Sequence, residues 1–329
     1  MESQYQELAA RIGLGQSERI PQLFKMIADE AEAELLLAMP GSVPELAEKL
    51  GRNQDDVADM VQTLFIKGLV FPSYRSDPPK YRMGRDIIQF HDATILWPDA
   101  PRAFLDLWQE WTDVEWPKLA EDFVQLMPRP GMRIIPVGVT LRPEGSVLAF
   151  EDVKEIIDGA RELAVTKCTC RLAAGRCDRL LEACLQVNNA AAYAIARGTG
   201  RKLTKDEALD ILKKSEEEGL IHTTFNKRGV DHVICNCCGD CCQFLPVVIK
   251  YGTALVDPSR FQAVVDPDLC TACETCLDRC YFGAITVDDF AVIDPDKCLG
   301  CGLCQVTCPS EAISMKEVRD KDYVPEKLF

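Results

Sequence analysis

The sequence has seventeen cysteines, and all of them lie in its second half, beginning at Cys168. The last eight form two runs with the same spacing, C-x2-C-x2-C-x3-C, and the second run starts 28 residues after the first. Three closely spaced thiolates can surround one 4Fe-4S cluster, and the fourth cysteine of such a run reaches the neighbouring cluster. We therefore predict a first cluster on Cys270, Cys273, Cys276 and Cys308, and a second cluster on Cys298, Cys301, Cys304 and Cys280.

The repeat includes residues around the ligands, since the Asp-Pro-Asp before Cys270 returns before Cys298 and an Ala-Ile pair follows the fourth cysteine of each run. This segment resembles the two-cluster bacterial ferredoxins, which implies low-potential one-electron transfer. One residue departs from the family pattern, because Pro309 follows Cys308 but Tyr281 follows Cys280. Two zinc ribbons fit less well, since ribbons separate C-x2-C pairs by a longer spacer.

The other nine cysteines are too many within about 75 residues to be explained by core packing. They are Cys168, Cys170, Cys177 and Cys184, followed by Cys235, Cys237, Cys238, Cys241 and Cys242. We predict that they bind one or two additional 4Fe-4S clusters. Structural zinc or a set of redox thiols are the alternatives, and His222 and His232 are further candidate ligands.

The elements that carry the first of these cysteines follow from local patterns. The stretch VTKCTC is rich in β-branched residues and predicts a strand, on which Cys168 and Cys170 would share one face about 6.5 Å apart. Asp178 is a good N-cap and predicts a helix that begins after Cys177. Cys177 would then lie in a flexible loop, from which it can approach Cys184. The arginines of this segment could offset the charge of thiolate ligands.

The later cysteines lie in CNCCGDCC, where adjacent residues of a regular strand or helix would diverge. We therefore expect a loop that turns at Gly239 and Asp240. The preceding segment has a capping-box pattern, with Thr204 as N-cap and Glu207 three residues later. It predicts a helix that ends near Gly219 and is followed by a strand.

The N-terminal part predicts three helices and a hairpin. The helices span residues 17–39, with Ser17 as cap, 43–51, and 53–67, with Asn53 as cap, and the hairpin spans 69–85. This order resembles a winged helix–turn–helix with 53–67 as recognition helix, so a redox-sensing DNA-binding regulator is one alternative function.

Charge argues against that alternative. The predicted recognition helix carries Asp55, Asp56 and Asp59, and residues 1–85 contain thirteen acidic against ten basic side chains, a net of −3. We expect a packing or protein-docking module and no nucleic-acid partner. Residues 86–132 hold all four tryptophans, and Phe104, Trp108 and Trp111 share one helical face, which predicts a core seam or a subunit interface in a homo- or hetero-oligomer.

The predicted fold is α+β and multidomain. It comprises a winged-helix-like domain (1–85), a helical Trp-rich connector (86–132), a Cys-rich α/β domain (133–261), a two-cluster ferredoxin-like domain (262–317) and a tail (318–329). From the expected strand at 133–140 to residue 317 the sequence resembles multidomain iron–sulfur proteins of anaerobes, which implies electron transfer in an anaerobic cytoplasm.

Net charge indicates the kind of partner. The chain carries −15 overall, and residues 262–329 carry thirteen acidic against six basic side chains, a net of −7. Such a surface fits a redox protein partner with a basic docking surface. No apolar run approaches the roughly 18 residues that span a bilayer, so direct membrane insertion is not expected. The polar opening residues do not have a leader pattern, which favours a cytoplasmic protein with reduced thiols.

Common catalytic motifs are missing, including the phosphate-binding loop, the dinucleotide fingerprint and the nucleophile elbow. The expected function is the relay of single low-potential electrons between a donor and a redox enzyme, as a non-catalytic subunit of an oxidoreductase complex. An enzyme with a substrate-binding middle cluster is the remaining alternative.

Overall fold

The computed structural model describes residues 3–137, 152–229 and 232–328, so the last three residues of the strand expected at 133–140 lie outside the described residues. The chain has mixed helix and strand content and divides into two compact units. Unit one comprises Met1–Pro117 with the short segments Leu172–Ala174 and Arg197–Thr199, and unit two comprises the remainder. In the described part of the chain, no helix combines the length and apolarity needed to cross a membrane.

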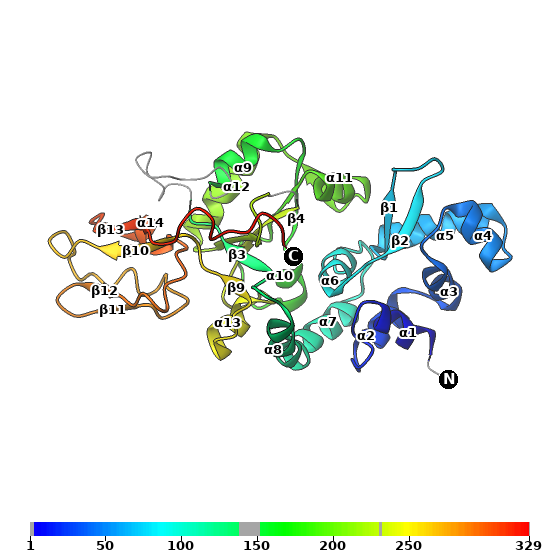
Figure 1. Cartoon of the computed structure of the whole chain (residues 1–329), viewed down its shortest axis with the longest axis horizontal. Helices are drawn as coiled ribbons and strands as arrows, with labels where there is room; N and C mark the ends of the chain where they lie inside the picture. Colours follow the sequence, from blue (N-terminus) through cyan, green and yellow to red (C-terminus); the bar gives the residue numbers. More distant parts are fainter. Residues whose placement is uncertain (1–2, 138–151, 230–231, 329) are drawn as a thin grey trace. The chain divides into compact units, whose positions relative to one another are not determined.

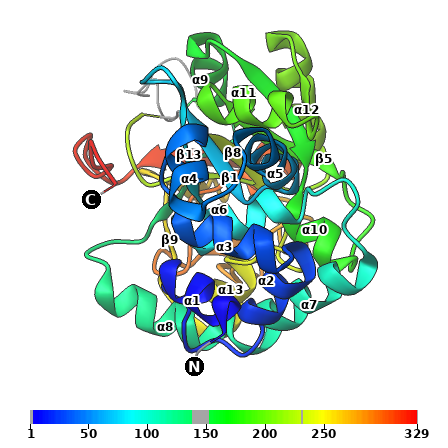
Figure 2. The same ribbon diagram turned by 90° about the vertical axis from the view of Figure 1, so that its right-hand side faces the viewer.

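Unit one is helical apart from one hairpin (Figure 2). Its helices are α1 (Gln4–Arg11), α2 (Ile20–Ile27), α3 (Glu30–Ala38), α4 (Val43–Leu50), α5 (Gln54–Lys67), α6 (Ile87–Thr94) and α7 (Arg102–Val114). Helix α8 (Trp116–Leu126) follows at the unit boundary. The predicted hairpin is present as β1 (Val70–Ser73) paired antiparallel with β2 (Lys80–Met83).

Capping residues set the helix limits in unit one. The single helix predicted over 17–39 is wrong, because Asp29 and Glu32 form a capping box that starts α3 after α2 has ended at Ile27. The Asn53 side chain caps α5 as predicted by accepting a hydrogen bond from the Asp55 amide. Gly51 ends α4 in the left-handed conformation that glycine adopts without strain.

The tryptophan-rich helix α7 turns its apolar face into the core of unit one, as its spacing predicted. Phe104, Trp108 and Trp111 are fully buried. The Trp108 ring lies 5.0 Å from the ring of Phe90 and 5.8 Å from that of Trp111, in tilted and edge-on arrangements that aromatic pairs prefer. This seam holds α6 against α7.

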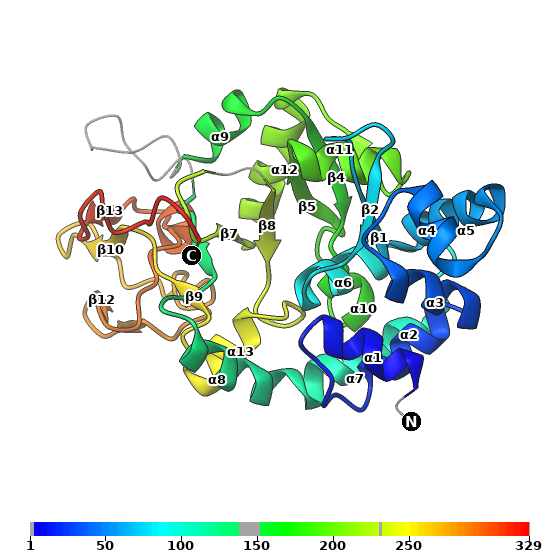
Figure 3. The same cartoon turned by 45° about the vertical axis from the view of Figure 1, so that its right-hand side comes forward.

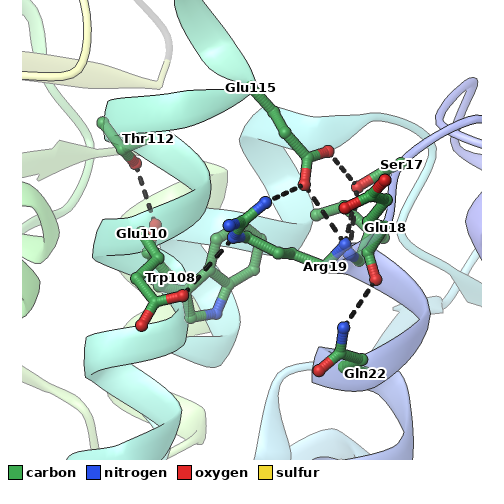
Figure 4. A network of polar contacts seen from close by, with 9 residues as sticks. Ser17, Glu18, Arg19, Gln22, Trp108, Glu110, Thr112 and Glu115 are labelled. Atoms are coloured by element: carbon green, nitrogen blue, oxygen red, sulfur yellow. Dashed lines mark hydrogen bonds and ion pairs between the residues drawn. The ribbon is translucent and has the colours of Figure 1, made fainter.

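A polar network fixes the start of α2 to the end of α7 (Figure 4). The buried Ser17 hydroxyl accepts the Ile20 amide at 3.0 Å and donates to Glu115 Oε2 at 2.5 Å. Glu115 Oε1 accepts from Arg19 Nη1 at 3.0 Å, whereas the exposed Glu110 reaches Arg19 Nε at 3.4 Å. The predicted cap at Ser17 is wrong in position, because the N-cap of α2 is Arg19. The Ser17 hydroxyl nevertheless accepts the first amide of α2, and it needs an acceptor at the end of α7.

Unit two is built on a seven-stranded sheet with the order β6-β4-β5-β8-β7-β3-β9 (Figure 3). The strands are β3 (Met132–Ile134), β4 (Leu163–Lys167), β5 (Glu182–Val187), β6 (Gly200–Lys202), β7 (Ile221–Phe225), β8 (Val233–Cys237) and β9 (Val256–Asp257). All neighbouring pairs are antiparallel except β3 and β9.

One face of this sheet forms the main core of unit two. Leu185 of β5 lies opposite Ile234 of β8, and both are buried against α9 (Val153–Gly159) and α12 (Lys205–Glu217). Because side chains alternate along a strand, the neighbouring residues Cys184 and Cys235 face the other side of the sheet. The capping box at Thr204 and Glu207 starts α12 as predicted.

The remaining elements of unit two complete the middle of the chain and its C-terminal segment. They are α10 (Thr169–Ala174), of which Leu172–Ala174 belong to unit one, α11 (Asn189–Ala196) and α13 (Leu245–Tyr251). In the C-terminal segment, β10 (Phe261–Val265) pairs with β13 (Ile313–Glu317), β11 (Ile285–Val287) pairs with β12 (Ala291–Ile293), and α14 (Leu303–Thr307) precedes β13 (Figure 1). Cysteines of both runs contribute to the small core between these hairpins.

We predict that Glu115→Ala lowers the stability of unit one by about 1 to 3 kcal/mol, because the buried Ser17 hydroxyl loses its acceptor. The measurement is the urea midpoint followed by tryptophan fluorescence. Glu110→Ala is the matched control and leaves the midpoint nearly unchanged, since exposed ion pairs contribute little. Equal effects of the two substitutions would contradict the assignment.

Candidate metal centres

The first ferredoxin set comprises the four cysteines predicted for the first cluster, Cys270, Cys273, Cys276 and Cys308. They line one cavity of the C-terminal segment. The Ala291 amide donates to Cys270 Sγ at 3.3 Å, and hydrogen bonding by Thr275 lowers the pKa of Cys273. Cys276 is buried, which raises its pKa, whereas Cys273 is exposed. The fourth cysteine of the second run thus lies with the first three of the first run.

The second ferredoxin set comprises Cys298, Cys301, Cys304 and Cys280, and it also converges. Burial, together with the neighbouring thiols of Cys280 and Cys298, raises the pKa of Cys301 to about 12. Burial likewise raises the pKa of Cys304, and the thiols of Cys301, Cys298 and Cys280 contribute to the shift. The Ala284 amide donates to Cys280 Sγ at 3.3 Å. The structure therefore brings together both predicted groups of four.

The elements that carry the middle cysteines differ from the predicted ones. Strand β4 ends at Lys167, Cys168 is the N-cap of α10, and Cys170 lies in the first turn of that helix. The predicted strand through both cysteines is wrong, because the pairing with β5 becomes irregular at Thr166 and Lys167. The helix expected after Cys177 is also wrong, since an irregular segment leads directly into β5.

The segment CNCCGDCC is only partly a loop. Cys235 and Cys237 belong to β8 and lie opposite Thr223 and Ile221 of β7, so the expectation of no regular strand is wrong there. The predicted turn at Gly239 and Asp240 is present. It separates the strand cysteines from Cys241 and Cys242.

Three middle cysteines form a compact group that we call the three-thiol set, Cys177, Cys238 and Cys241. Their sulfur atoms lie within 4.8 Å of one another, and Cys241 Sγ is 3.5 Å from Cys177 Sγ. The Cys241 amide donates to Cys238 Sγ at 3.3 Å across the turn. Burial and, to a smaller extent, the charge of Cys238 raise the pKa of Cys241 to about 12.

The other middle cysteines form a connected six-thiol set, Cys168, Cys170, Cys184, Cys235, Cys237 and Cys242. Each thiol lies close enough to the next to shift its pKa, in the order Cys184, Cys235, Cys237, Cys242, Cys170 and Cys168. Sequence neighbours are thus divided between the two sets. Hydrogen bonds from Cys235 and Cys242 lower the pKa of Cys237 to about 5, although burial opposes the shift.

Arg171 lies between the two middle sets. Its side chain is buried and donates to the backbone carbonyls of Leu180 and Asn236. Burial lowers the pKa of Arg171, but the charges of Cys168 and Cys238 outweigh it and leave the net pKa above its usual value. Burial likewise raises the pKa of Cys238, yet backbone amides and the guanidinium of Arg171 lower it overall. A permanent cation here stabilises thiolates.

Polar side chains that the sequence did not single out support the strand cysteines. Thr223 Oγ1 lies 3.4 Å from Cys237 Sγ, and Gln186 Nε2 donates to Cys184 Sγ at 3.1 Å. Gln186 lies two residues from Cys184 on β5 and so shares its face, whereas Thr223 lies on β7 and meets Cys237 only through the pairing of β7 with β8.

Histidine ligation receives no support from the position of His222. Its Nδ1 lies 2.5 Å from Asn236 Oδ1, and its Nε2 lies 3.1 Å from Glu216 Oε1. Both ring nitrogens are therefore engaged, and the ring is buried. The His232 ring packs edge-on against Phe225 at 5.8 Å.

The donor chemistry of these sets fits iron–sulfur clusters. Each ferredoxin set supplies four convergent thiols, which is the number that one 4Fe-4S cluster takes. In the middle, thiols with lowered pKa, such as Cys237 and Cys238, provide the thiolate form that binds metal. When bound, such clusters accept and release one electron at a time.

The C-terminal segment matches a known protein family. The 4Fe-4S binding domain matches twice, at residues 263–286 and 291–314. No protein of curated function and no solved structure matches the chain. The two matches cover both cysteine runs, and the segment is therefore a ferredoxin-type 4Fe-4S binding domain.

We predict that Arg171→Ala destabilises unit two by about 3 kcal/mol or more, because two buried carbonyls and a buried thiolate lose their cationic donor. Urea unfolding of the anaerobically purified protein, followed by circular dichroism, measures the loss. Arg176→Ala removes an exposed arginine of the same segment and serves as control. Arg171→Lys should recover part of the stability. An Arg171→Ala variant as stable as Arg176→Ala would refute the role.

Proposed function

We propose that this protein relays single low-potential electrons through two 4Fe-4S clusters in its C-terminal domain and one or two further clusters in the middle of the chain. The supporting observation is that nine additional cysteines gather in the same unit as the ferredoxin-type domain. The first cluster is held by the first ferredoxin set and the second by the second ferredoxin set. The protein works in the cytoplasm of an anaerobe as a subunit of an oxidoreductase complex.

The middle clusters use the remaining thiols. A six-thiol set exceeds the four ligands of one cluster, and the three-thiol set forms a separate compact group, with Arg171 close to members of both sets. Two centres fit this division better than one. Structural zinc is the alternative occupant, because three thiolates and one further ligand also make a zinc site.

Unit one serves in docking. The order α3, α4, α5 and a β-hairpin supports a winged-helix-like domain, and the buried tryptophans of the following helices add to the core of the same unit. The side chains of Asp55, Asp56 and Asp59 are exposed on α5, which disfavours a DNA phosphate backbone and favours protein contact.

The electron-transfer partner meets an acidic surface. Five exposed carboxylates belong to this part of the chain, because Glu274 lines the cavity of the first ferredoxin set and Asp268, Asp278, Asp288 and Asp289 lie within two residues of other lining residues. A redox protein with a basic docking surface is the complementary partner, and its association should weaken as salt increases.

We predict that the anaerobically purified protein contains about 12 to 16 irons per chain with a matching amount of acid-labile sulfide, corresponding to three or four 4Fe-4S clusters. Cys273→Ala with Cys276→Ala should remove about four irons by dismantling the first ferredoxin set. Cys238→Ala with Cys241→Ala should remove the iron and sulfide that the three-thiol set binds. Iron, sulfide and zinc are measured together by elemental analysis.

The measured iron and zinc contents distinguish 4Fe-4S clusters from zinc in the two middle sets. A count of about eight irons with no zinc would reject metal in the middle of the chain. About eight irons with zinc at one or more atoms per chain would replace the additional clusters with structural zinc.

A second function is favoured by the three-thiol set itself. Among the described residues, only three ligand atoms gather there within 4.8 Å, one fewer than a 4Fe-4S cluster takes. A centre with one open position can bind a substrate, which would make the protein an enzyme as well as a carrier.

We predict for this second function that cyanide, as a small probe ligand, changes the EPR spectrum of the reduced protein. The change should be absent from the variant with Cys238→Ala and Cys241→Ala and retained when the first ferredoxin set is removed. An unchanged wild-type spectrum with cyanide and with other small ligands would discard the enzymatic function and leave the electron relay intact.

A further inference from the structure

The two ferredoxin repeats differ at one equivalent position. Pro309 follows Cys308 and is exposed, whereas Tyr281, 28 residues earlier, follows Cys280 and is partly buried. Burial raises the pKa of Tyr281, and the charges of Cys238 and Asp240 contribute to the shift. The tyrosine therefore lies near the turn that carries two members of the three-thiol set.

Tyr281 packs directly on this turn. A Cβ atom placed on Gly239 would lie 2.6 Å from Tyr281 Cδ1 and 3.3 Å from Ile249 Cδ1, so only glycine leaves room for the ring. The Arg179 guanidinium carbon lies 5.7 Å from the centre of the ring on which it packs. The ring thus contacts both the Gly239 turn and Arg179, which lies two residues after Cys177.

Two further contacts join the second ferredoxin set to the middle of the chain. The Val137 amide donates to the Cys301 carbonyl at 3.0 Å. Arg279, which precedes Cys280, donates to the Glu217 carbonyl at 2.9 Å at the end of α12. In contrast, Cys273 of the first ferredoxin set is exposed. The two sets are alike in their cysteines but differ in their surroundings.

We propose that Tyr281 is a positioning residue that fixes the three-thiol set beside the second ferredoxin set, so that the ferredoxin domain exchanges electrons with the middle centre on its Cys280 side. This inference rests on the proposed function of the middle thiols. One electron moves, and no bond forms or breaks. The centre that gives the electron is oxidised by one electron, and the centre that receives it is reduced by one electron. The electron comes from an external low-potential one-electron carrier protein.

The first test uses the apo protein and therefore does not depend on metal. Tyr281→Ala should increase the rate at which iodoacetamide alkylates Cys238 and Cys241 by about tenfold, because the turn loses its aromatic cover. Tyr281→Phe keeps the ring and should behave as wild type. Pro309→Ala is the matched change in the other repeat and should not affect these two thiols. Peptide mass spectrometry gives the rate for each cysteine.

A second variant reaches the same contact from the other side. Gly239→Ala places a methyl group where the Tyr281 ring lies and should also speed alkylation of Cys238 and Cys241. Combined with Tyr281→Ala it should add little, because the ring that it displaces is already absent. Additive effects of the two substitutions would contradict a direct contact.

The holo protein supplies the test of electron exchange. In the dithionite-reduced wild type, magnetic interaction should broaden the EPR signals of the second ferredoxin centre and the middle centre. Tyr281→Ala should weaken this interaction without changing the iron content, and Pro309→Ala should leave it intact. If the protein contains about 12 or more irons per chain and Tyr281→Ala changes neither the EPR broadening nor the alkylation rates, the role of Tyr281 is overturned and the proposed electron relay stands. About eight irons without zinc would instead overturn the proposed function, whatever the alkylation shows.

Discussion

The buried guanidinium of Arg171 connects the segments that carry the middle cysteines. It donates to the carbonyl of Leu180, before β5, and to that of Asn236, in β8, and it lies beside the Cys238 thiol. A buried cation is costly unless anions or dipoles surround it, and clustered thiolates repel one another unless a cation is near. The arginine and the thiols therefore depend on each other, and the convergence of β5, β8 and the Gly239 turn depends on both.

Strand register is the second constraint on the site. Leu185 and Ile234 pair across β5 and β8 on the face that α9 and α12 cover. This buried face fixes the register, because a slip of one residue would expose both apolar side chains. The same register places Cys184 and Cys235 together on the opposite face. Packing of the core thus determines which cysteines meet.

The sequence predicts local features of this fold well and distant ones poorly. The two ferredoxin sets follow from the repeated cysteine spacing, in which the fourth cysteine of each run joins the other run, and the caps at Asn53 and Thr204 follow from neighbouring residues. The division of the middle thiols does not, because Cys184 meets Cys235 only through strand pairing across about fifty residues. The β-branched residues of β4 run up to α10 and therefore predict a strand where the helix begins. The helix predicted over 17–39 is interrupted at Asp29, where Asp29 and Glu32 form the capping box that starts α3.

The duplicated C-terminal pattern gives two centres the same ligands, so any difference between them has to come from their surroundings. Solvent exposure and hydrogen bonds to sulfur are among the features that set the potential of an iron–sulfur cluster. The Cys301 carbonyl accepts a hydrogen bond from the Val137 amide, and burial raises the pKa of the Cys301 thiol. Cys273, in contrast, is exposed, and the hydrogen bonds that its thiol accepts lower its pKa. A repeat that is symmetric in sequence therefore becomes asymmetric once Tyr281 and Val137 pack one half against the rest of unit two. That asymmetry distinguishes an end with the exposed Cys273 from an end whose Tyr281 packs on the Gly239 turn.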